Sequence, residues 1–182
     1  MKKILFYILT MVLVLSSCST KKYDEKLCKG FSVVSEIVAF SALVCDETSS
    51  TWSTAIYDNK DSHGRYCSDF NKALRILRED LEEVGVLDTI SSKKNTLNTI
   101  AKELVKYPNS RKDAYNDFIE LVTDVNSFAD LAIDPEGSLT SYRADVNALA
   151  SSIKKQMDAF ELKYGDFLIQ YIDKEESLED DW

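Results

Sequence analysis

Apolar side chains recur every three or four residues along most of this chain, which is the spacing of one face of an α-helix. The first such stretch covers residues 24–59, and its middle, residues 31–45, is apolar on nearly all sides, with Glu36 as its only charge. Exposing that surface to water would be costly, at about 25 cal/mol per Å². We therefore expect one long central helix packed against several others, in preference to a second membrane span.

A polar turn at residues 58–64 separates this helix from a second, expected over residues 65–83. The apolar stripe of the second helix includes Tyr66, Phe70 and Val84, and charged residues occupy the opposite face. This amphipathic pattern predicts a helix with one face in the core and the other in water.

Two more helices are predicted around the first proline. The third covers residues 92–107 and ends at Pro108, which cannot continue a helix. Ser110 and Asp113 then resemble a capping box, with Asp in place of the usual Glu, and open a fourth helix.

The turn at residues 134–137 ends the fourth helix, and Ser138 is expected to cap the last one. An apolar stripe continues from there for about 35 residues, with Gly165 as a candidate bend. The acidic residues 173–182 are expected to form a frayed tail.

Composition agrees with a helical protein. The 182 residues include only five Gly and two Pro, and 45% are hydrophobic, which is enough to build the core of one domain. We expect an all-α bundle of four to five helices, with one long central N-terminal helix and one long C-terminal helix. The expected organisation is a signal peptide at 1–17, a tether at 18–23, the bundle at 24–172 and the acidic tail at 173–182.

The start of the chain has the features of an export signal. Two lysines precede the apolar run 4–15, which is shorter than the roughly 20 residues that a membrane span needs. The run ends in Leu15-Ser16-Ser17-Cys18. This ending resembles the lipobox of bacterial lipoproteins, in which the cysteine is diacylated, for example with palmitate, and becomes the new N-terminus. The alternative is a plain secretory signal in which Cys18 is incidental.

The resemblance implies that lipidated Cys18 attaches the mature protein to a membrane outside the cytoplasm, either the cytoplasmic or the outer membrane of the cell envelope. Two acyl chains give long-lived attachment, whereas a single chain holds a protein only marginally. Lys21 and Lys22 lie in the short tether and would be close to anionic head groups. The bundle is therefore expected near the lipid surface.

Net charge argues against nucleic acid as a partner. The whole chain has 22 basic and 31 acidic residues, and loss of the signal removes two lysines, so the mature charge is 20 minus 31, or −11. A phosphate backbone requires a basic surface.

Three cysteines remain after Cys18, an odd number for an exported protein. Cys28, Cys45 and Cys67 are either free buried thiols, or Cys45 and Cys67 form a disulfide. If one helix runs unbroken to Asn59, Cys45 and Cys67 differ in height by about 15 Å, beyond the span of a disulfide.

Catalytic and metal-binding patterns are not found in the sequence. His63 is the only histidine and lies in a predicted turn, and the five glycines are too far apart to hold a phosphate. We expect no enzyme, no metal and no cofactor.

Three segments resemble small helical lipoproteins of unassigned function, and more loosely phage superinfection-exclusion lipoproteins. They are residues 52–57 (WSTAIY), 69–74 (DFNKAL) and 134–142 (DPEGSLTSY). Our leading hypothesis is a non-enzymatic protein that contacts another envelope or surface protein. Interference with injection of phage DNA is one alternative function, and carriage of a small apolar ligand between helices is another.

Overall fold

The computed structural model describes the backbone of residues 2–179 and the side chains of residues 20–166 and Leu168. Within that part the chain is all-α, as the spacing of apolar residues predicts, with one isolated β-bridge. The elements are α1 Lys2–Tyr57, α2 Phe70–Glu83, α3 Val86–Glu103, the 3₁₀ helix η1 Asn109–Arg111, α4 Lys112–Ile133 and α5 Leu139–Glu179.

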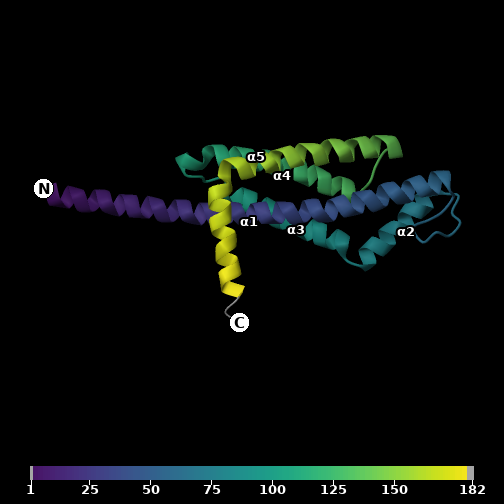
Figure 1. The fold of residues 1–182 in the computed structure, drawn as a ribbon, viewed down its shortest axis with the longest axis horizontal. Coiled ribbons are helices and arrows are strands. Elements are labelled where there is room, and N and C mark those ends of the chain that lie inside the picture. Colours follow the sequence, from purple (N-terminus) through teal and green to yellow (C-terminus); the bar gives the residue numbers. More distant parts are fainter. Residues whose placement is uncertain (1, 180–182) are drawn as a thin grey trace.

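Helix α1 is the centre of the bundle and contacts α2, α3, α4 and α5 (Figure 1). Leu27, Val34 and Ile37 on this helix are fully buried, which confirms the predicted central position. Among the described residues, Thr20–Tyr57 is long and apolar enough to cross a membrane by length and composition. However, half of the most apolar stretch of 18 residues in this segment is buried inside the bundle. A core helix of a bundle meets the same criterion.

At its N-terminal end α1 extends further than the sequence indicated. The helix begins at Lys2 and continues through the expected signal and tether, where it projects from the bundle (Figure 1). The side chain of Cys18 lies outside those that the structure describes. Tyr23 is the first buried side chain in the described part, so the packed core begins five residues after Cys18.

The start of α2 differs from the prediction. Lys60 and Tyr66 form an antiparallel β-bridge, and the helix begins only at Phe70, with the Asp69 carboxylate accepting the amide of Asn71 (3.0 Å). A side-chain N-cap satisfies one of the amides that a helix start leaves unpaired. The placement of Tyr66 and Val84 in the buried stripe was wrong, because they are 81% and 75% exposed.

The observed boundaries of α3 and α4 also differ from the predicted ones. Gly85 adopts a left-handed conformation (φ 74°) that ends α2, so α3 begins at Val86 instead of residue 92. It ends at Glu103, before Pro108 is reached. The prediction of a capping box at Ser110 was wrong, because Ser110 lies in η1 and α4 has no side-chain N-cap.

Helix α5 begins as predicted, since the Ser138 hydroxyl accepts the amide of Ser141 (3.2 Å). It remains helical to Glu179, seven residues beyond the expected end of the bundle domain. The first part of α5 runs along α4, and its last part turns sharply away (Figure 1).

An aromatic cluster joins α1, α4 and α5. Phe160 stacks on Phe31 with ring centroids 5.1 Å apart, and its centroid lies 6.3 Å from that of Phe118. Gly30 allows this packing, because a Cβ atom there would lie 2.6 Å from Cζ of Phe118. Stacked and tilted aromatic pairs of this kind contribute beyond their buried area.

Candidate interaction surfaces at the distal end

The end of the bundle opposite the N-terminus carries exposed apolar side chains. It comprises the end of α1, the loop at residues 58–69 and the start of α2 (Figure 1). Its exposed large side chains, which we call the distal patch, are Ile56 (44% exposed), Tyr57 (74%), Tyr66 (81%) and Phe70 (39%). Exposed apolar groups at one end of a bundle are candidates for an interaction site.

Asp61 organises the loop that carries Tyr66. Its side chain is 3% exposed and accepts the amides of His63 and Arg65 and the Nε–H of Arg65, each at 2.9 Å. Burial acts to raise the pKa of this carboxyl, but the hydrogen bonds from Arg65 and His63 outweigh it and lower the pKa. The loop is therefore built around an ionised carboxylate.

His63, which lies in the predicted turn, is half-exposed and pairs with α2. Its Nε2 lies 3.0 Å from Oδ2 of Asp80, and Ser62 donates to the same oxygen (3.2 Å). Among the described residues, no group of three or more His, Cys, Asp and Glu is placed to hold a metal ion. The contacts of His63 fasten the loop to α2.

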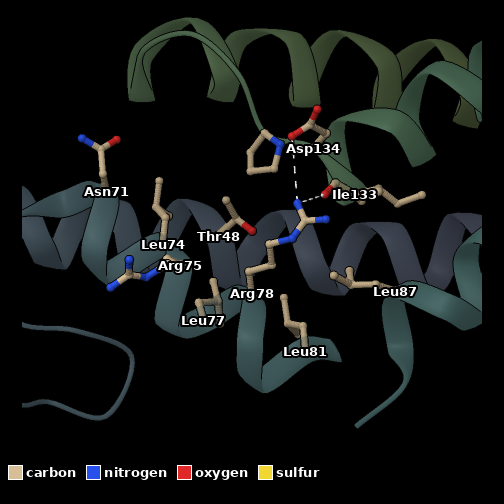
Figure 2. Close-up of a pocket in the computed structure, with 12 residues that line it drawn as sticks. Thr48, Asn71, Leu74, Arg75, Leu77, Arg78, Leu81, Leu87, Ile133 and Asp134 are labelled. Atoms are coloured by element: carbon tan, nitrogen blue, oxygen red, sulfur yellow. Dashed lines mark hydrogen bonds and ion pairs between the residues drawn. The ribbon is translucent and has the colours of Figure 1, made fainter. Parts of the chain in front are cut away.

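A groove with a cavity volume of about 250 Å³ lies between α2, α1 and the end of α4 (Figure 2). Its lining is largely aliphatic, and polar side chains stand at its rim. The lining residues are Thr48, Asn71, Leu74, Arg75, Leu77, Arg78, Leu81, Leu87, Ala132, Ile133, Asp134 and Pro135.

Arg78 spans this groove from α2 to the end of α4 (Figure 2). Its Nη1 donates to the carbonyl of Ile133 (3.0 Å) and lies 4.0 Å from the Asp134 carboxylate, while Nε donates to Glu82 (2.8 Å). A guanidinium is suited to this role because its donors are fixed in a plane. The floor of the groove is therefore aliphatic, and the Arg78 guanidinium that crosses it is already paired with Ile133, Asp134 and Glu82.

Cys45 and Cys67 are free buried thiols in the structure and do not form the disulfide that was the alternative. Because α1 runs unbroken to Tyr57, the chain does not fold back early enough to bring them to the same height. Cys45 lies instead beside the buried hydroxyl of Tyr142, which donates to the carbonyl of Leu131 (3.3 Å). Burial raises the pKa of the Cys45 thiol.

Comparison of the chain with protein-family models, with curated proteins and with solved structures finds no match.

Sequence reasoning missed two residues that shape the distal end. Asp61 was one of several acids in a polar turn, and Arg78 was one of several charges on an exposed helix face. No local pattern distinguishes them, because the partner of Arg78 lies 55 residues away. The exposure of Tyr66 had a weak local signal, namely the helix cap at Asp69 that excludes it from α2.

Proposed function

We propose that this protein is a bacterial envelope lipoprotein, attached to a membrane through lipidated Cys18, that acts by contact with another envelope or surface protein. The observation that carries this proposal is the distal patch at the end of the bundle opposite the chain start. Exposed aromatic side chains such as Tyr57 and Tyr66 are favoured in protein interfaces because they bury a large area at a small entropic cost.

The length of α1 supports the proposal. Cys18 and Tyr57 lie on the same helix, 39 residues apart, which corresponds to about 60 Å at roughly 1.5 Å per residue. A protein held at Cys18 can therefore present the distal patch well away from the lipid surface. This is the geometry expected of an anchored protein that meets partners outside the membrane.

Site-specific photocrosslinking in cells tests the contact. A photoreactive phenylalanine in place of Tyr57 or Tyr66 should yield discrete adducts with one partner, whereas the same group in place of Lys155, exposed on the side of α5, should not. Identical adducts from all three positions would mean non-specific capture and would refute the distal patch as the contact surface.

Membrane fractionation tests the anchor separately. Cys18→Ala should release or mislocalise the protein, while the circular dichroism and the unfolding midpoint of the purified variant stay unchanged. Unaltered membrane attachment of Cys18→Ala would remove the lipoprotein proposal.

A second candidate function is carriage of a small apolar ligand, and the aliphatic groove between α2 and α4 favours it. Native mass spectrometry of the purified protein after exposure to lipid extracts should then show added mass. Widening the groove by Leu77→Ala or filling it by Ala132→Leu should change the fraction of protein that carries the added mass. The smaller groove of Ala132→Leu should lower that fraction. Unmodified protein in every extract would exclude this function.

A further inference from the structure

We propose that the anchor-proximal end of the bundle rests on an anionic lipid surface and holds the distal patch outward. This inference depends on the proposed lipid anchor and adds the contact surface and the lipid class. We define the base as residues 20–31 of α1, residues 100–118 around η1 and residues 160–168 of α5. These segments meet at one end, since Arg111 pairs with Asp24, and Phe160 stacks on Phe31.

Charge is distributed unevenly along the bundle. The base has nine Lys and Arg against seven Asp and Glu, a net charge of +2. The rest of the bundle, residues 32–99 and 119–159, has ten basic and eighteen acidic residues, a net charge of −8. An anionic surface therefore attracts the base and repels the remainder of the bundle.

Ion pairing leaves lysines of the base available for lipid. Within the described part of the chain, ion pairs join Asp24 to Arg111, Glu103 to Lys26 and Asp117 to Lys163. Six exposed lysines of the base make no ion pair with a described residue: Lys21, Lys22, Lys29, Lys102, Lys106 and Lys112. The other acids of the base are Glu25, Asp113, Glu161 and Asp166.

Apolar and aromatic groups accompany these lysines. Val105 is 55% exposed and Leu162 is 89% exposed. Tyr107 and Tyr115, both partly buried, have ring centroids 4.8 Å apart between α3 and α4. Lysine, tyrosine and exposed aliphatic side chains together are typical of surfaces that lie at the head-group level of a bilayer.

The position of the anchor adds to the charge argument. Helix α1 leaves the bundle at the base and continues toward Cys18 (Figure 1). Acyl chains on Cys18 would therefore bring this end, and no other, within a few residues of the head groups. One opposing element is the acidic segment 173–182, with six carboxyl side chains against one lysine. Its removal should strengthen the lipid contact.

Energy transfer in vesicles tests the orientation. The full mature, lipidated protein with Tyr57→Cys is labelled with a donor at that exposed position and reconstituted in vesicles that carry acceptor head groups. The vesicles contain phosphatidylcholine alone or with a 30% share of phosphatidylglycerol. Phosphatidylglycerol should lower the transfer severalfold, because an upright bundle places residue 57 about 60 Å from the surface. Salt at 0.5 M should restore the energy transfer, because it screens the attraction between the base and the anionic head groups.

Charge reversal in matched pairs identifies the surface. Lys102→Glu with Lys106→Glu, in the base, should abolish the dependence on phosphatidylglycerol, whereas Lys60→Glu with Lys72→Glu, at the distal end, should retain it. Both double variants change the net charge by the same amount. Transfer that does not depend on phosphatidylglycerol while the protein stays on the vesicles would overturn this inference alone. Loss of the protein from the vesicles would instead refute the proposed anchor.

Discussion

Arg111 and Asp24 form a two-pronged ion pair that joins the start of α4 to the beginning of the packed part of α1. Nε and Nη2 of Arg111 donate to the two carboxylate oxygens of Asp24, at 2.7 and 2.8 Å. These hydrogen bonds raise the pKa of Arg111 above its ordinary value, and both side chains are less than one-third exposed. The pair fixes the base of the bundle across 87 residues of sequence.

Replacing this arginine should destabilise the protein. Arg111→Gln is expected to lower the free energy of unfolding by roughly 2 kcal/mol, because it leaves the largely buried Asp24 carboxylate without its charged donor. Arg75→Gln provides the control, since Arg75 and Glu79 are both 68% exposed and 3.8 Å apart, and should cost about 0.5 kcal/mol or less. Urea unfolding measures both. Equal losses would show that the Arg111 pair is no stronger than a surface contact.

Two glycines within helices should respond to alanine in opposite ways. Gly30→Ala places a Cβ atom 2.6 Å from the buried ring of Phe118 and 3.1 Å from Ile100, so a loss of roughly 1–3 kcal/mol is expected despite the better helix propensity of alanine. Gly165→Ala meets no atom within 4 Å and should add up to about 1 kcal/mol. Thermal unfolding of the two variants measures the direction of each change in stability. A stabilising Gly30→Ala would contradict the close packing of α1 on α4.

The loop at residues 58–69 should open in acid. The folded pKa of Asp61 is lowered, so its stabilising bonds are present above the ordinary carboxyl pKa of 3.8 and are lost as the pH falls below that value. The protection factors of the His63 and Arg65 amides, both donors to Asp61, should fall at least tenfold through this range, when exchange is compared with the intrinsic rate at each pH. Asp61→Ala should show fast exchange already at pH 7, while Asp58→Ala in the same loop should not. Acid-resistant protection in the unsubstituted protein would rule out this role of the carboxylate.

Buried thiols should resist alkylation until the protein unfolds. Burial raises the pKa of Cys28 to about 12, so the thiolate is scarce and shielded at pH 8. Above pH 9.0, the ordinary thiol pKa, the unfolded chain releases this proton and the folded chain keeps it, so the free energy of unfolding should fall as pH rises. Maleimide labelling with and without urea, and urea titrations at pH 8 and 10, measure these effects. Cys28→Ala should make the free energy of unfolding depend less steeply on pH between pH 8 and 10. An unchanged pH dependence would contradict the raised pKa of Cys28.

The sequence by itself determined the fold class and the central element. The spacing of apolar residues gave the all-α bundle, and the nearly uniform apolarity of residues 31–45 predicted a helix surrounded by others. The cap at Ser138 was also predictable, because a serine after a Pro-Gly turn satisfies helix amides through bonds only three residues long. Signals of this kind are local, so they can be read without knowing the rest of the structure.

Only the tertiary structure decided which surfaces are available for binding. Tyr66 fits the apolar stripe of α2 by spacing, but the Asp69 cap and the bridge to Lys60 place it in water. The difference in charge between the base and the rest of the bundle likewise depends on how distant segments meet. Residues around Asp24, Arg111 and Phe160 come together because long antiparallel helices return the chain repeatedly to the same end, and no local pattern carries that information.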